Sequence, residues 1–210
     1  MPATAKRLDR IERRAVDKFT ERRAELAEAA LQTLAELGYA RTSLREIAQK
    51  SEFSHGVLHY YFKDKADLIT CCVRQYKIRC ITRYSQATAS AVSYDELLES
   101  FLEGLGDSIR HDGAMHRLWF DLRTQSLFES DYRAEVVDLD KNIEDMIWLI
   151  VSRLFELAGV PNNATPAATY AMIDGLFLVA LFRHFSGDAN AIAEMQTGLR
   201  LMLTQFIKPA

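Results

Sequence analysis

Proline and glycine are scarce in this chain, with four and nine residues among 210. Runs of alternating Val, Ile and Thr bounded by turn residues, which would indicate β-strands, are also missing. These absences leave little room for a sheet. The sequence therefore predicts an all-α fold, for which we expect about nine helices.

Long uninterrupted apolar runs are a second absence. None reaches the roughly 20 residues that a membrane helix needs, and the N-terminus is charged where a secretory signal would be apolar. Hydrophobic residues still make up 49% of the chain, so a sizeable core can be buried in water. We expect a soluble cytoplasmic protein with no membrane partner.

Cysteine is the third scarce residue, with Cys71, Cys72 and Cys80 the three examples. Their odd number gives no paired disulfide framework, and their spacing is unlike that of a zinc site. Reduced thiols are the expected state. The adjacent pair leaves thiol-based redox sensing open as an alternative. No metal or other cofactor is expected.

Net charge is also small, at −3, but it is unevenly distributed. Residues 1–65 hold 13 Lys and Arg against 10 Asp and Glu, a net +3, whereas the remainder holds 13 against 19, a net −6. A basic N-terminal part joined to an acidic body is typical of a protein whose head binds nucleic acid.

Hydrophobic periodicity indicates where the helices lie. Leu26, Ala30 and Leu34 keep a 3.6-residue period that Gly38 ends. Residues 1–18 are expected to form a basic arm, with an extension of the first helix as the alternative. Later helix starts are predicted at Ser93, at Thr165 before a proline, and at Asp188, and a long apolar stripe predicts a helix over residues 131–158.

The segment over residues 167–185 is apolar nearly all round, so a helix there must be buried on several sides. With the final helix it is predicted to form a homodimer interface. The alternative is the central helix of a monomeric bundle. The expected interface residues are Met172, Gly175, Val179, Phe182, Leu199, Met202 and Phe206.

Two short helices joined by a tight turn are predicted between residues 43 and 61. Ser43 and Glu46 have capping-box spacing at the first, and Ser54 can cap the second after a turn at residues 51–53. This is a helix-turn-helix, whose second helix is small enough to enter the DNA major groove. Phe53, Leu58 and Phe62 are expected to face the core, which leaves His55, Gly56, His59 and Tyr60 facing outward.

Residues 42–68 also carry a distinctive set of motifs: the Ile47-Ala48 pair, Ser54-x-Gly56, Leu58-x-x-Tyr61-Phe62 and Lys63-x-Lys65-x-x-Leu68. This run resembles the head of the TetR (tetracycline-repressor-like) family of transcription regulators. Glu52 departs from the pattern because the family commonly has Gly in the turn, so Glu52 is expected to need a positive φ or a locally different turn.

The resemblance implies roles for residues of the head. It places Arg45, His55, Val57 and His59 at base edges, and Thr42, Ser54, Tyr60, Tyr61 and Lys65 at phosphates. For Tyr61 a core ring beneath the recognition helix is an equal alternative. His55 and His59 are four residues apart, as in a metal site, but no third ligand is evident.

The resemblance also implies three segments: the arm at 1–18, the DNA-binding head at 19–67, and an effector-binding and dimerisation body at 68–210. Aromatic side chains in the body could form a pocket for a small apolar or aromatic effector, although plain core is the alternative. The candidates are Met115, His116, Trp119, Phe120, Arg123, Trp148 and Phe177, with Arg123 or His116 able to pair with a carboxylate or hydroxyl.

We therefore expect a homodimeric repressor on a near-palindromic DNA operator, relieved by ligand; a ligand-dependent activator is the alternative. An enzyme using His116, Asp121 or Asp174 is a remote possibility, because no nucleophile elbow, phosphate loop or paired-carboxylate motif is present. An architectural DNA-coating protein would need a more basic surface.

Overall fold

The computed structural model describes residues 17–31, 33–34, 43–162 and 164–207, with side chains up to residue 205. Most of the expected basic arm, the helix stop at Gly38, the phosphate candidate Thr42 and the side chain of Phe206 lie outside the described residues. The predictions made for them stay predictions.

The described ranges are built from eight helices and contain no strand, which confirms the all-α prediction. The first helix is described over residues 17–31 and 33–34. It is followed by α2 (Leu44–Lys50), α3 (His55–Tyr61), α4 (Lys65–Ser90), α5 (Tyr94–Ser126), α6 (Arg133–Ala158), α7 (Pro166–Phe185) and α8 (Ala191–Ile207).

Helix starts follow the predicted caps in all but one case. The hydroxyls of Ser43, Ser93 and Thr165 each accept a hydrogen bond from the backbone N–H three residues later. The start predicted at Asp188 is wrong, because α8 begins at Ala191. The Asp188 carboxylate instead accepts from the Asn190 N–H and pairs with Arg183, which closes a turn before the helix.

The turn between α2 and α3 differs from the family pattern without strain. Positive φ among the described residues occurs only at Gly159 and Gly187. Glu52 therefore has an ordinary φ, and of the two alternatives the structure has the second, a locally different turn. The N–H of Phe53 instead bonds the hydroxyl of Ser51, two residues earlier.

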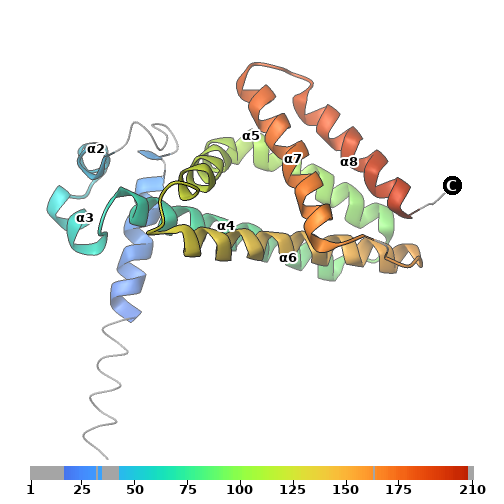
Figure 1. The fold of residues 1–210 in the computed structure, drawn as a ribbon, viewed down its shortest axis with the longest axis horizontal. Coiled ribbons are helices and arrows are strands. Elements are labelled where there is room, and N and C mark those ends of the chain that lie inside the picture. The colour runs from blue at the N-terminus through green and yellow to red at the C-terminus, as the bar shows by residue number, and fades with distance from the viewer. Residues whose placement is uncertain (1–16, 32, 35–42, 163, 208–210) are drawn as a thin grey trace, which may run out of the picture.

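The helices form a head at one end and a layered body at the other (Figure 1). In the body α4 and α6 pack side by side, α5 packs against both, and the α7–α8 pair covers α5 and α6. One continuous cluster of buried residues runs from Leu26 in the first helix to Leu203 in α8. The segment boundary expected between residues 67 and 68 falls inside α4, so a continuous helix connects head and body.

Helix α7 has one face in this core and another at the surface. By length and composition alone, it is long and apolar enough to cross a membrane. This corrects our expectation that no segment of the chain would be. The reason is that single polar residues such as Asp174 interrupt an apolar run without making the helix polar. One third of its apolar window is buried, and Asp174 pairs with Arg123 of α5.

The dimer interface is predicted to use apolar residues on the outer face of α7 and α8, and the prediction for one of them is wrong. Leu199 is fully buried in the chain's own core, so it offers no surface to a second subunit. Leu201, with 59% of its surface exposed, is an outward residue of α8. Val179 and Phe182 are exposed on α7, as is Gly175, while Met172 and Met202 are half-buried.

The head is joined to α4 by a small polar network around Asp67. Its carboxylate accepts hydrogen bonds from Arg23 at 2.5 and 3.2 Å and from the Lys63 N–H at 2.9 Å. Arg23 also donates to the carbonyl of Tyr61, at the end of α3, at 2.8 Å. The first helix, α3 and α4 are thereby connected at one point.

Replacing Asp67 by alanine removes the acceptor for these bonds and leaves half-buried donors unpaired. We expect Asp67→Ala to lower the free energy of unfolding by about 2 kcal/mol, a typical loss for charge-assisted hydrogen bonds. The measurement is urea denaturation of wild type and variant. Asp145→Ala is the control, because Asp145 is 60% exposed and forms only a surface ion pair. Equal losses in the two variants would contradict a special role for the Asp67 network.

Candidate DNA-binding surface and ligand cavity

The head exposes the side chains predicted to read bases. Arg45 of α2 and His55 and His59 of α3 are exposed, and the two histidine rings lie 4.3 Å apart between centroids. Tyr60 is 72% exposed beside them. Beneath this surface Leu44, Ile47, Leu58 and Phe62 are buried and hold α2 and α3 against the first helix and α4.

The remaining predicted head contacts are less exposed. Val57 and Tyr61 are half-buried and pack against the core. The Tyr61 ring lies 4.9 Å from the Phe19 ring between centroids, so this residue serves packing even if its hydroxyl also reaches DNA. Ser54 is exposed, although its hydroxyl already caps α3 by accepting from the Val57 N–H. Lys65 is half-buried at the start of α4.

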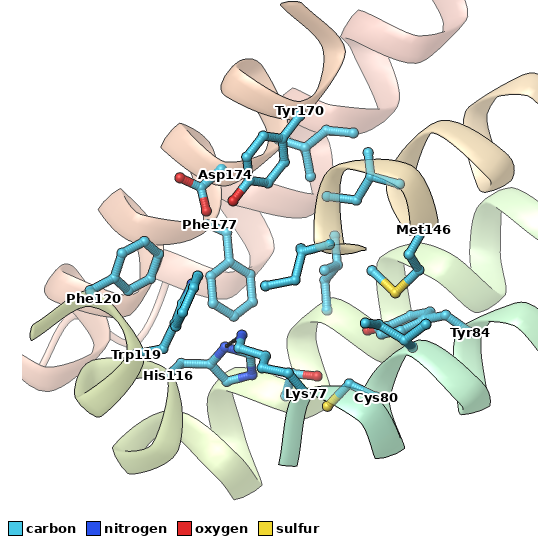
Figure 2. A pocket seen from close by; sticks show the side chains of 16 residues that line it. Lys77, Cys80, Tyr84, His116, Trp119, Phe120, Met146, Tyr170, Asp174 and Phe177 are labelled. Atoms are coloured by element: carbon cyan, nitrogen blue, oxygen red, sulfur yellow. Dashed lines mark hydrogen bonds between the residues drawn. The ribbon is translucent and has the colours of Figure 1, made fainter. Parts of the chain in front are cut away.

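A partly open cavity of about 60 Å³ lies between α4, α5, α6 and α7. Its walls are mainly apolar, and Trp119, Phe120 and Phe177 contribute aromatic rings (Figure 2). Met146 and Ile143 of α6 and Ile173 of α7 supply aliphatic surface. Apolar walls with a few placed polar groups are typical of small-molecule sites.

Of the seven predicted pocket residues, His116, Trp119, Phe120 and Phe177 line this cavity, and three others do not. Met115 lines a separate surface hollow on the other side of α4. Trp148 is half-buried on α6 and directly follows the lining residue Ile147, so the turn of the helix aims it elsewhere. Arg123 is held in ion pairs outside the lining.

Arg123 fills an aromatic and acidic site at one end of the cavity. Its guanidinium binds Asp174 at 2.8 Å and Asp140 at 3.3 Å. It also lies within 6.0 Å of the ring centroids of Trp119, Phe120 and Tyr170. The Tyr170 hydroxyl donates to Asp140 at 2.6 Å. The carboxylates of Asp140 and Asp174 are therefore already paired with the Arg123 cation.

Sequence reasoning missed Lys77, a buried amine in the cavity wall. Its Nζ lies 3.1 Å from Nδ1 of His116, whose Nε2 is 3.0 Å from the Tyr76 hydroxyl. The available signal was a single lysine in the apolar stripe Val73, Cys80 and Tyr84, at helical spacings of three and four.

Burial sets the protonation of this pair. It lowers the pKa of Lys77 to about 8 and, helped by the charges of Lys77 and Arg83, lowers the pKa of His116 well below its ordinary value. His116 is therefore neutral near pH 7. When Lys77 is an ammonium, Nδ1 of His116 accepts its hydrogen bond, so Nε2 carries the proton and donates to Tyr76.

Cys71 and Cys72 lie near the start of α4, and Cys80 lines the cavity. All three are free, with Cys72 and Cys80 buried and Cys71 half-buried. Burial raises the pKa of Cys71, and raises that of Cys72 well above its ordinary value. A raised pKa keeps these two thiols protonated and slow to react, which disfavours the redox-sensing alternative. The described part of the chain contains no group of three or more side chains that could hold a metal ion. The His55 and His59 pair has no third ligand there.

Comparison with known proteins extends this description. Residues 26–70 match the family model for bacterial regulatory proteins of the tetR family. The regulator BetI of Stenotrophomonas maltophilia (strain R551-3), an HTH-type transcriptional regulator, is 28% identical over 162 residues, 75% of this chain and 80% of that protein.

Two solved structures show the same fold at low identity. A transcriptional regulator from Saccharomonospora viridis in complex with choline has a TM-score of 0.68 and 18% identity, covering 89% of this chain and 95% of its own. The regulator FadR from Bacillus subtilis, in complex with stearoyl-CoA, has a TM-score of 0.64 and 15% identity, covering 88% and 97%.

The buried amine of Lys77 should cost the protein stability near neutral pH. Its pKa falls from 10.5 to about 8 on folding, so the unfolded chain binds more protons between these pH values. Stability should therefore rise with pH across this window, by roughly 3 kcal/mol from the size of the shift. Below pH 8 the penalty is fully present.

We expect Lys77→Met to raise the free energy of unfolding at pH 7 by about 1–3 kcal/mol, because an apolar side chain replaces a buried charge. The gain should shrink toward pH 10. Urea denaturation at both pH values measures it, with Lys141→Met, a change at an exposed lysine, as the control. A less stable Lys77→Met protein, or a gain independent of pH, would contradict the assignment.

Proposed function

The chain belongs to the tetR family of bacterial regulatory proteins, and from that premise we propose that it is a homodimeric repressor. It binds a near-palindromic DNA operator in the cytoplasm and is released by a small ligand. One observation carries this proposal: a single helix, α4, begins beside the helix-turn-helix and lines the cavity with Lys77, Cys80 and Tyr84.

DNA binding rests on the exposed face of α2 and α3. Arg45 has the fork of donors that suits guanine, and the rings of His55 and His59 can donate to or accept from base edges in the major groove. Tyr60, Ser54 and Lys65 are proposed to hold phosphates, a contact that positions the head on any sequence. Thr42 is proposed for the same role by family resemblance.

Dimerisation is supported by an apolar surface that a single chain leaves open. Val179 is 54%, Phe182 71% and Leu201 59% exposed on α7 and α8, next to the small residue Gly175. Apolar residues gathered on one face favour a partner of the same shape, and a two-fold pair matches a palindromic operator. The two recognition helices would then lie about one DNA turn apart, or a multiple of it.

Control of DNA binding by a ligand is proposed because α4 lines the cavity and also carries the head. A ligand in the cavity that fits one position of α4 better than another shifts the two heads, and about 1.4 kcal/mol of that preference changes operator affinity tenfold. Arg74 of α4 pairs with Glu135 and Asp138 of α6, so movement of α4 must also rearrange this contact.

The ligands of the two structural relatives do not transfer directly. A choline-like cation needs aromatic rings and carboxylates, and here Arg123 already occupies Trp119, Tyr170 and Asp174. A long acyl chain needs far more room than a cavity of about 60 Å³ gives. A compact apolar or aromatic effector needs less rearrangement of the lining side chains, although it too requires more room than about 60 Å³.

Selection of bound DNA from a random pool tests operator recognition. We expect an inverted-repeat site, with Lys65→Ala weakening all sequences alike and His59→Ala changing the preferred bases. The loss at a contacted base pair should be about 1–3 kcal/mol. Lys141→Ala, at an exposed lysine of the body, is the matched control. Identical base preferences for wild type and His59→Ala would reject the role of His59.

Sedimentation of wild type and Phe182→Glu tests the dimer surface. A carboxylate at the proposed interface should leave the variant monomeric at micromolar concentration, because burying an unpaired charge costs several kcal/mol. Val137→Glu places the same change on an exposed residue of α6, outside the proposed surface, and should stay dimeric. A monomeric wild type, or a dimeric Phe182→Glu protein, would contradict the assignment.

A further inference from the structure

The cavity holds a charged group whose hydrogen bonds are incomplete. Lys77 is 6% exposed, and an ammonium group carries three N–H donors. Among the described residues, its hydrogen-bond partner is Nδ1 of His116. The Trp119 ring, with its centroid 5.5 Å from Nζ, adds a weaker attraction. The remaining donors border the cavity.

No carboxylate of the described residues pairs directly with the Lys77 ammonium. His116 is neutral and so cannot balance it. The described ion pairs give Lys77 no carboxylate, because Asp174 and Asp140 bind Arg123. Figure 2 shows Asp174 and Tyr170 across the cavity from Lys77 and His116, with Phe177 between them. The cavity thus has a cationic end and a separate, already paired acidic end.

A second polar group of the lining also lacks a partner. The Tyr84 hydroxyl is buried and makes no hydrogen bond within the described part of the chain. Tyr84 lies seven residues after Lys77 on α4, on the same side of the helix, and both line the cavity. Buried donors without partners cost free energy, which a ligand with acceptor oxygens recovers.

We propose that the effector is an organic anion, a carboxylate on a compact apolar or aromatic body, and that Lys77 binds its carboxylate. The rings of Trp119, Phe120 and Phe177 enclose the apolar body. This proposal rests on the proposed function in taking the cavity as the effector site. It narrows the effector class by charge, and it replaces Arg123 with Lys77 as the anion-binding residue.

The position of Lys77 also explains how such a ligand would act. Lys77 lies 12 residues after the start of α4, about 18 Å along the helix axis from the head. A carboxylate that draws the ammonium away from His116 pulls on α4 itself. Binding energy is thereby applied to the helix that carries the DNA-binding head.

Calorimetric titration with matched acids, amides and amines tests the proposal at pH 7. The probes are benzoate, benzamide and benzylamine, with phenylacetate, phenylacetamide and phenethylamine as a second series. We expect at least one acid to bind wild type, and at least tenfold more tightly than its amide and its amine. Lys77→Met should reduce this preference to within about threefold, whereas Lys141→Met should keep it.

The pH dependence of acid binding to the wild-type protein tests the role of Lys77 without a variant. With the pKa of Lys77 at about 8, the ammonium fraction falls about tenfold between pH 7 and pH 9, and acid binding should weaken by the same factor. Amide binding should not change. Charged and titratable groups around Lys77 come from four helices: Tyr76 and Cys80 of α4, His116 and Arg123 of α5, Asp140 of α6 and Asp174 of α7.

Several results would overturn the proposal: no acid binds, an amide or amine binds as tightly as its acid, or Lys77→Met keeps the preference. If Lys77→Met does not fold, the wild-type comparison and its pH profile decide. Acid binding that leaves operator affinity unchanged would instead contradict ligand-relieved repression while supporting Lys77. Operator selection without binding of any acid would contradict Lys77 alone.

Discussion

Helix α4 runs without a break from the DNA-binding head to the ligand cavity. Its 26 residues span about 39 Å as one rigid helix. Asp64 caps its start beside the recognition helix, and Lys77, Cys80 and Tyr84 line the cavity farther along. Because α4 is one continuous helix, we expect a shift of its cavity-lining part to displace the head. The Asp67 network fixes the near end of α4, and its packing against α5 and α6 fixes the rest.

The two cations beside the cavity, Arg123 of α5 and Lys77 of α4, have different partners. Arg123 neutralises Asp174 and Asp140 and ties α5 to α6 and α7, so it acts as a structural cation. Lys77 has no carboxylate partner among the described residues, and its lowered pKa predicts a cost in stability. A buried amine that weakens the fold is typical of a binding residue, since stability alone would favour a methionine there.

The sequence predicted the fold in detail wherever the signal was local. Ser43, Ser93 and Thr165 cap helices as predicted, because a hydroxyl three residues before a free N–H is sufficient. Asp188 failed because its carboxylate had a competing partner, Arg183, which only the folded chain brings near. At Glu52 the sequence left a positive φ and a locally different turn open, because only the folded chain shows that the Ser51 hydroxyl bonds the Phe53 N–H.

The ligand cavity was only partly predictable for the same reason. His116, Trp119, Phe120 and Phe177 are ring-bearing residues that the sequence predicts for the pocket, and they line the cavity. Arg123 was expected to bind ligand, but Asp174, 51 residues away in sequence, pairs with it. Lys77 was missed because composition cannot say which lysine of a helix is buried. Leu199 was assigned to the outer face because an apolar stripe does not reveal which partner it contacts.

On this proposal, a ligand held at Lys77 moves the two heads through α4. The most direct test is the distance between spin labels placed at Gln49, an exposed residue of α2, in the two subunits of the dimer. A carboxylate probe that binds should shift this distance in wild type and leave it unchanged in Lys77→Met. An unchanged distance in wild type at saturating probe would contradict the claim.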